Sequence, residues 1–293
     1  TGGAGFIGSH IADALVADNE VVIVDNLSTG SLENVPADAE FVEGDVRDRE
    51  VMSAVMEGVD IVFHHAAIVS VEQSIEDPEL THDVTTRATI QLLELARRES
   101  ARVIFASSAA VYGQPESVPI AETDSTEPTS PYGLAKLNAD QYVRLYADLY
   151  DVEAIPLRYF NVYGPRQTAG DYSGVISIFL QQACEGGPIT VHGDGSQTRD
   201  FIHVSDVVQA NVRAAVQGVP GRGYNIGTGE SISIVELAET IREVVGTEDS
   251  VEIEHIKSRE GDINESRAAI DQATADLEFE STVRLQDGLA DLV

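Results

Sequence analysis

Short apolar runs that alternate with amphipathic segments constrain the fold of this chain more than any other feature. The runs at 21–25, 41–45, 61–67, 102–108 and 154–161 have the length of strands, and helical patterns lie between them. Alternating strands and helices indicate βαβ units, and continuously apolar runs are typical of parallel strands that are buried on both faces. We therefore expect an α/β fold with a Rossmann-like, doubly wound parallel sheet.

The pattern becomes less regular in the second half of the chain, where shorter strands and helices alternate. We expect residues 1–165 to form the domain that contains most of the sheet. Residues 166–293 are expected to form mainly a smaller α/β domain that is interwoven with the sheet. The chain starts inside a Gly-rich turn of a kind that follows a strand, so we also expect a strand before Thr1.

The charge balance excludes two classes of partner. The 293 residues include 18 Lys and Arg but 50 Asp and Glu, which gives a formal net charge of −32. Nucleic acid and anionic membranes would be repelled, and no apolar run approaches the ~20 residues that span a membrane. The acids are spread along the chain, and only Lys136 and Lys257 are lysines. This pattern favours a protein of a high-salt cytoplasm over an ordinary solvated acidic surface, because salt screens the repulsion.

Cysteine usage and the first residues bear on the cellular compartment. A single cysteine, Cys184, excludes an internal disulfide and fits a reducing cytosol. We expect this side chain to fill space on a buried helix face. The first residues lack the basic region and the apolar core of a secretory signal, so we expect a cytoplasmic protein.

The Gly-rich turn GGAGFIG predicts a dinucleotide site. Glycines at positions 2, 5 and 8 allow a tight turn, a close approach to a pyrophosphate and close packing of the following helix. The next strand ends in Asp25, where an acid accepts hydrogen bonds from ribose hydroxyls and repels a 2′-phosphate. We therefore expect NAD rather than NADP. Asp45 ends the following strand, where it either meets the adenine or caps the next helix.

Tyr132 and Lys136 are the second candidate pair. Ser130 and Pro131 predict the start of a helix, and residues four apart lie on one face of a helix. A tyrosine has a pKa of ~10, so it acts as a base near neutral pH only if nearby positive charge stabilises the phenolate. Lys136 offers a compact charge that can also donate to ribose hydroxyls, which a planar guanidinium would do less well.

Two serines follow the strand at 102–108. Ser107 and Ser108 lie where an open α/β sheet places its ligand, beyond the carboxyl ends of the strands. A serine hydroxyl can both donate and accept, so it can relay a proton or stabilise a substrate oxygen. We expect no metal site, because the neighbouring His64 and His65 point to opposite faces of a strand.

In these motifs the chain resembles the extended short-chain dehydrogenase/reductase superfamily and, within it, the NAD-dependent epimerase/dehydratase family. The resemblance covers essentially the whole chain. It is carried, in order, by TGGAGFIGSH, VDNLSTG, GDVRD, HHAA, SSAAVYG, SPYGLAK, LRYFNVYGPRQ, RDFIHVSDV, YNIGTGE and REGDI.

The resemblance implies three sets of site residues. The catalytic residues are Ser108, Tyr132 and Lys136. The residues that contact NAD are Gly2, Gly5, Phe6, Ile7, Gly8, Asp25, Asn26, Ser28, Thr29, Gly30, Asp45, Val46, His65, Ala66, Ala67, Ile68, Thr85, Ser107, Tyr132, Lys136 and Tyr159. The residues that contact the sugar nucleotide are Ser108, Tyr132, Asn161, Val175, Thr190, His192, Arg199, Arg259, Asp262 and Ser266, with the two arginines at the diphosphate.

The implied activity is C4 epimerisation of a UDP sugar of the UDP-glucose/UDP-galactose type by transient oxidation with bound NAD. The small Ser266 suggests that N-acetylated sugars are also accepted. A UDP-uronic acid epimerase or decarboxylase, a 4,6-dehydratase and a non-catalytic NAD-binding protein remain alternatives. The family's dehydratases have Asp-Glu after the catalytic hydroxyl residue, whereas this chain has Ala109 and Ala110.

Two further points come from the resemblance. It implies a homodimer in which helices at about 77–99 and 130–150 pair with their symmetry mates. The chain also departs from the family in the first of these helices. Thr85 stands where the family usually has an asparagine that lies on the cofactor side of the pocket.

Overall fold

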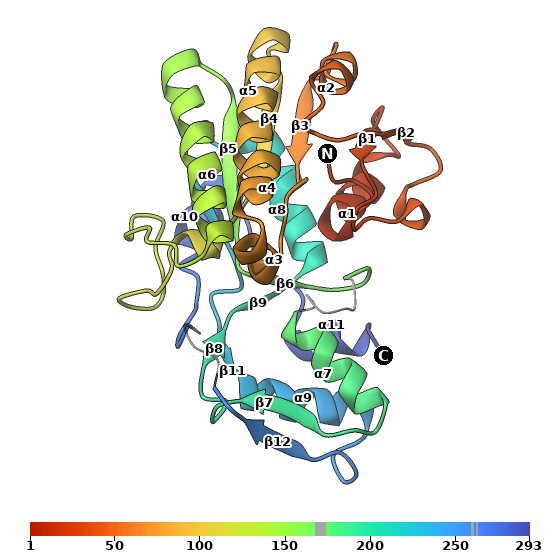
Figure 1. Cartoon of the computed structure of the whole chain (residues 1–293), viewed down its shortest axis with the longest axis vertical. Helices are drawn as coiled ribbons and strands as arrows, with labels where there is room; N and C mark the ends of the chain where they lie inside the picture. The colour runs from red at the N-terminus through yellow and green to blue at the C-terminus, as the bar shows by residue number, and fades with distance from the viewer. Residues whose placement is uncertain (168–173, 259–260, 262) are drawn as a thin grey trace.

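The computed structural model describes residues 1–167, 174–258, 261 and 263–293. Figure 1 shows an upper part, in which helices cover a parallel sheet, and a smaller lower part that contains the C-terminus. Within the described residues, no helix has both the length and the apolar character that a membrane crossing requires.

The sheet is parallel throughout. Four strands are hydrogen-bonded in the order β10-β5-β4-β3, and β1 pairs separately with β2. The strands are β1 (Val22–Asp25), β2 (Glu40–Glu43), β3 (Ile61–His64), β4 (Arg102–Ser108), β5 (Ala154–Tyr159) and β10 (Tyr224–Ile226). The first two residues connect the two groups of strands. Gly2 N donates to the carbonyl oxygen of Val24 at 2.9 Å, and His65 N donates to that of Thr1 at 3.1 Å.

Helices cover both faces of this sheet. On one face, α2 (Arg49–Val55), α5 (Ala88–Glu99) and α6 (Pro131–Tyr150) form a core with β3 and β4 around Leu92, Phe105 and Val143. On the other face, α8 (Val204–Gln217) and α10 (Asp271–Leu277) pack on β4, β5 and β10 around Ile155 and Val207. α1 (Phe6–Leu15) packs against α8. The doubly wound α/β fold is thereby confirmed.

Short elements connect these layers. Helices α3 (Val71–Glu76) and α4 (Pro78–His82) lead through a π-helical turn, η2 (Asp83–Arg87), into α5. Two 3₁₀ turns are η1 (Leu32–Asn34) and η3 (Ala109–Val111). The predicted start of α6 is confirmed, because Ser130 Oγ accepts a hydrogen bond from Gly133 N at 3.1 Å and Pro131 is the first helical residue.

The lower part has its own apolar core around Phe179, Val191 and Leu237. Its elements are β6 (Asn161–Tyr163), α7 (Val175–Cys184), β7 (Ile189–His192), β8 (Thr198–Arg199), β9 (Phe201–His203), β11 (Ile232–Ser233), α9 (Ile234–Val245), β12 (Ile253–Ile256) and α11 (Leu285–Ala290). The chain returns to the upper part in α8, β10 and α10 (Figure 1). The boundary near residue 165 and the strand before Thr1 remain predictions.

The prediction for Cys184 is wrong. This side chain is exposed at the last position of α7. The buried face of that helix is formed by Ile176, Phe179, Leu180 and Ala183, and residue 184 lies about 100° further round the helix than residue 183.

Candidate active site

The three predicted catalytic residues lie where α6 packs on the end of β4. Tyr132 interacts with the side chain of Ser108, the last residue of β4. Lys136 lies one turn further along α6 and is only 3% exposed. Its Nζ donates to the carbonyl oxygen of Ala106 at 2.6 Å and lies 5.2 Å from the centroid of the Phe105 ring. The ammonium group of Lys136 is therefore largely removed from water, which strengthens its electrostatic interactions.

Burial acts on both titrating groups. It raises the pKa of Tyr132, and the hydrogen bond with Ser108 acts in the opposite direction. Burial also lowers the pKa of Lys136 to about 7. The protein alone therefore favours the neutral phenol. We expect the phenolate of Tyr132 to be stabilised by Lys136 and the positively charged nicotinamide ring together, and Lys136 alone does not reverse the effect of burial in the protein without cofactor.

The Gly-rich turn has the shape of a phosphate cradle. A Cβ on Gly8 would lie 2.2 Å from the carbonyl oxygen of Gly2, and Gly2 itself has a φ of +69°. Helix α1 begins without a side-chain cap, so its first amides point toward the space that a pyrophosphate would occupy. Phe6 and Ile7 are the first residues of this helix. These features fit the pyrophosphate of a dinucleotide.

Asp25 lies beside the Gly-rich turn, at the position where a ribose contact is expected. Its carboxylate accepts hydrogen bonds from Ala4 N at 3.0 Å and from Leu27 N at 2.8 Å, which fixes its position at the end of β1. Gly30 approaches the same turn so closely that a Cβ there would lie 2.9 Å from the Ala4 backbone. In the segment between Asp25 and Gly30, Ser28 N donates to Asn26 Oδ1 at 3.1 Å, and Thr29 follows Ser28 in the chain.

Asp45 does not cap the following helix, because the N-cap of α2 is Asp48. The Asp45 carboxylate is instead bound by the guanidinium of Arg47 at 2.8 and 2.7 Å and by Asn26 Nδ2 at 3.1 Å. Arg47 is the main cause that lowers the pKa of Asp45 to about 2. Asp45 therefore stays ionised next to the loop that carries Asn26, and buried Val46 follows it.

The segment after β3 lies beside the Gly-rich turn, since a Cβ on Gly2 would lie 2.7 Å from Ala66 N. Ala67 and Ile68 continue this segment. His65 Nε2 lies 3.0 Å from the hydroxyl of Tyr159, which donates to Asn211 Oδ1 at 2.9 Å. His65 Nδ1 is buried without a partner, and burial lowers the pKa of His65 to about 3. The ring of His65 is therefore neutral.

Comparison with known proteins supports this arrangement. The model of the NAD dependent epimerase/dehydratase family matches residues 1–227. This chain belongs to that family. The curated UDP-glucose 4-epimerase of Mycolicibacterium smegmatis is 36% identical over all of the chain and 96% of its own length. The predicted family, fold class and NAD cofactor are therefore confirmed.

Solved structures of sugar-nucleotide epimerases are also similar to this chain. The UDP-glucose 4-epimerase of Thermotoga maritima with UDP-glucose has a TM-score of 0.95 and 35% identity over 99% of this chain and 95% of its own. The UDP-N-acetylglucosamine 4-epimerase of Methanobrevibacter ruminantium in complex with UDP-N-acetylmuramic acid has a TM-score of 0.94 and 34% identity, covering 99% and 94%.

The structure brings together some of the residues that were predicted to contact the sugar nucleotide. Ser266 N donates to the carbonyl oxygen of Thr198 at 3.2 Å, next to Arg199, whose Nη1 donates to Ile263 O at 2.6 Å. Asn161 Nδ2 donates to the Asp200 carbonyl oxygen at 3.0 Å. These bonds place Asn161, Arg199 and Ser266 around one backbone junction.

Three more of the residues predicted to contact the sugar nucleotide lie on β7 and α7. Thr190 exchanges two hydrogen bonds with the Gln182 side chain, and His192 Nδ1 lies 3.0 Å from the carbonyl oxygen of Lys257. Val175 is the first residue of α7. Arg259 and Asp262 lie outside the described residues.

Sequence reasoning missed a buried ionic group behind the catalytic residues. Asp140 on α6 binds Arg158 on β5 and the hydroxyl of Ser107. The available signal was an arginine inside the otherwise apolar run AIPLRYFN, because a buried guanidinium requires an anionic partner.

Proposed function

We propose that this chain is an NAD-dependent C4 epimerase of UDP sugars of the UDP-glucose/UDP-galactose type. One observation carries the proposal. Tyr132 interacts with Ser108 at the end of β4, one helical turn from the buried Lys136, in a chain similar over its full length to UDP-glucose 4-epimerases. Titratable groups whose pKa values are strongly shifted by burial are concentrated at functional sites.

In the proposed reaction, Tyr132 as a phenolate accepts the proton of the sugar 4-hydroxyl, and Ser108 bridges the two oxygens. Bound NAD supplies the reversible acceptor for the C4 hydride, which returns to the opposite face of the sugar. Lys136 holds the ribose hydroxyls of the cofactor and keeps positive charge beside Tyr132.

Replacement of Tyr132 by Phe tests this assignment. The variant keeps the ring and is expected to bind NAD and UDP-glucose, but to lose about 10²-fold or more in kcat because the general base is absent. The measurement is conversion of UDP-glucose to UDP-galactose, with protein-bound NAD as the control for an intact site. A variant that epimerises at the wild-type rate would remove Tyr132 from the mechanism.

Product analysis separates the alternatives. A 4,6-dehydratase would convert its nucleotide sugar to a 4-keto-6-deoxy product, and a uronic acid decarboxylase would release CO₂. The alanines after Ser108 disfavour the first, because elimination of water requires an additional acid and base. Formation of UDP-galactose from UDP-glucose with neither of these products would support the epimerase.

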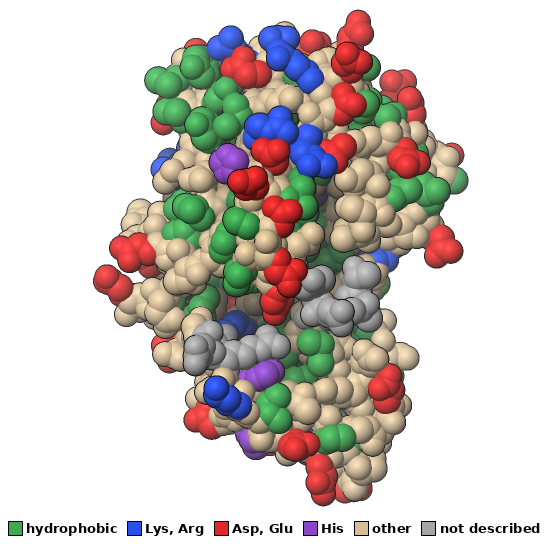
Figure 2. All heavy atoms as spheres, viewed as in Figure 1, with side chains coloured by type: hydrophobic (Ala, Val, Ile, Leu, Met, Phe, Trp, Pro, Cys, Tyr) green, Lys and Arg blue, Asp and Glu red, His purple; other side chains and the backbone are tan. Residues whose placement is uncertain are grey.

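We also propose a homodimer. The support is a set of exposed apolar side chains on α3 and α6, seen for α6 as part of the hydrophobic surface at the upper left of Figure 2. The set comprises Val71, Ile75, Leu134, Tyr142, Leu145, Leu149 and Tyr150. Such a patch on a highly charged protein fits a second copy of the same surface. Light scattering in high salt is expected to give the dimer mass, and a monomer mass would contradict this.

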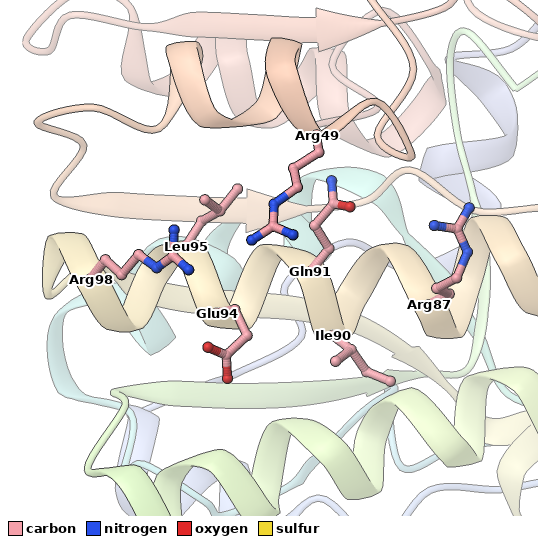
Figure 3. Close-up of a pocket in the computed structure, with 7 residues that line it drawn as sticks. All are labelled: Arg49, Arg87, Ile90, Gln91, Glu94, Leu95 and Arg98. Carbon is pink, nitrogen blue, oxygen red and sulfur yellow. The ribbon is translucent and has the colours of Figure 1, made fainter.

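A cavity of about 200 Å³ lies beside this surface, between α2 and α5. Figure 3 shows Arg49 of α2 and Arg98 of α5 pointing into it above Glu94. None of the residues that line it belongs to the predicted site. The cavity is therefore separate from the predicted site.

A high-salt cytoplasm is the proposed environment. The support is the net charge of −32, whose acidic side chains are spread over upper and lower parts of the face in Figure 2. Salt would relieve the self-repulsion of this surface.

A further inference from the structure

The ionic group behind the catalytic residues is completely buried. Asp140 is 0% and Arg158 is 1% exposed. Arg158 Nε and Nη2 donate to the two carboxylate oxygens of Asp140, each at 3.0 Å, and Ser107 Oγ donates to Asp140 Oδ2 at 2.7 Å. Arg158 is itself anchored, because its Nη1 donates to the Tyr112 hydroxyl at 2.8 Å and to Glu122 O at 3.2 Å.

Stability does not explain this group. Two charges lose their hydration when they are buried, and well-packed apolar residues commonly replace such a pair at no loss of stability. The same helix and the neighbouring strand contribute apolar residues to a core, with Val143 of α6 and Phe105 of β4 among its members. The position of the pair relative to Tyr132 and Lys136 therefore bears on its role.

Asp140 continues a stripe along α6. Tyr132, Lys136 and Asp140 are spaced four residues apart, so they lie on one face of the helix. Each contacts a different residue at the end of β4. Tyr132 contacts Ser108, Lys136 donates to Ala106 O, and Asp140 accepts from Ser107. Three successive turns of α6 are thus fixed to three successive residues of β4.

We propose that Asp140, held by Arg158, is a positioning residue that fixes the rotation and the axial position of α6 on β4 and thereby sets the contact between Tyr132 and Ser108. This inference rests on the proposed function of Tyr132 as the base. Asp140 touches neither residue, and it acts through the backbone of the helix and through Ser107.

Arg158 has a second part in this arrangement, because it cancels the charge of Asp140. An unpaired carboxylate one turn from Lys136 would compete with the Ala106 carbonyl oxygen for the ammonium group. The neutral pair leaves the Lys136 ammonium bound to the carbonyl oxygen of Ala106. Conversely, loss of the carboxylate alone would leave the Arg158 charge uncompensated and would favour the phenolate of Tyr132.

The test compares Asp140→Asn and Ser107→Ala with wild type, using Asp206→Asn as the control. Asp206 is a carboxylate of similar burial that binds Ser281, Thr282 and Val283 in another part of the molecule. Three quantities are measured: kcat and KM for UDP-glucose, bound NAD, and the titration of the Tyr132 phenol. The titration is followed by NMR of protein labelled with ¹³C at the tyrosine phenol carbon, and Tyr132→Phe identifies the signal.

If Asp140 positions α6, Asp140→Asn lowers kcat at least about tenfold with little change in KM or bound NAD, because only the transition-state geometry is lost. Its Tyr132 signal titrates at lower pH than in wild type. Ser107→Ala is also expected to lower kcat. It leaves no uncompensated charge, so it can replace Asp140→Asn in the test if that variant does not fold. Asp206→Asn lowers the melting temperature and leaves kcat and the titration unchanged.

A lower melting temperature with wild-type kcat and titration in both Asp140→Asn and Ser107→Ala would overturn the inference. The titration needs no turnover, so it separates this inference from the proposed function. If wild type does not epimerise UDP-glucose but Asp140→Asn shifts the titration of Tyr132, the proposed substrate is wrong and the electrostatic coupling of Asp140 to Tyr132 stands, whereas the positioning of α6 requires the loss of kcat in Ser107→Ala on the true substrate.

Discussion

Lys136 gives this protein an unusual pH dependence of stability. The side chain is buried, and desolvation lowers its pKa from 10.5 to about 7 in the protein without cofactor. In the unfolded chain the ammonium is hydrated and keeps its ordinary pKa. Between these two values the unfolded state binds more protons than the folded state. The free energy of unfolding therefore rises with pH across this interval.

The expected magnitude follows from the two pKa values. Each pKa unit between the unfolded and the folded state corresponds to about 1.4 kcal/mol. The full destabilisation of the folded state is reached at pH values below the pKa of Lys136 in the folded protein. Between pH 7 and pH 9 the contribution of Lys136 to the free energy of unfolding should rise by about 2 kcal/mol. The hydrogen bond to Ala106 O favours the ammonium and should make the rise smaller rather than larger.

Urea unfolding of NAD-free protein at constant salt, at several pH values, measures this rise. Lys136→Met is the matched reference, because methionine fills much of the same volume without a titrating group. The difference in free energy of unfolding between the two proteins isolates Lys136 from the many acidic groups. A difference that stays flat between pH 7 and pH 9, or that changes with the opposite sign, would refute the reasoning.

Three further predictions concern the cofactor, the sugar and salt. Gly8→Ala should greatly reduce bound NAD in purified protein, because its Cβ would lie 2.2 Å from Gly2 O, whereas Gly5→Ala, at 3.3 Å, should retain more; equal losses would contradict this. Wild type should accept N-acetylated UDP sugars, and Ser266→Tyr should selectively lower kcat/KM for them, because a phenol occupies the space of an acetamido group; an unselective loss would count against it. The melting temperature should rise from low to molar KCl, and a flat or falling trend would remove the high-salt proposal.

The fold could be predicted from sequence because its signals are local. The apolar runs became β1 to β5, and Ser130 with Pro131 marked the start of α6. The Gly-rich turn and Asp25 also lie together, since both belong to one short βα-type unit in which spacing fixes the geometry. Signals of this kind depend on residues that are close along the chain.

Contacts that depend on how elements pack could not be predicted. The burial of Cys184 was wrong because helical spacing alone does not say which face of α7 meets the core. Asp45 pairs with Arg47 and Asn26, and the latter comes from a different loop. The pairing of Asp140 with Arg158 depends on the rotation of α6 relative to β5, which no local pattern records.

Thr85 shows how a departure from a family pattern can be interpreted once the structure is known. It lies in the π-helical turn between α4 and α5, a feature that is frequent at functional sites. Its Oγ1 is buried without a partner, although the carbonyl oxygen of Thr85 accepts from Thr89 Oγ1 at 2.5 Å. An unpartnered buried hydroxyl costs about 1–3 kcal/mol, and valine or alanine at this position would avoid that cost. The threonine that stands where the family has an asparagine therefore keeps a buried polar group without a partner among the described residues, and we expect the bound cofactor or a water molecule to provide the missing partner.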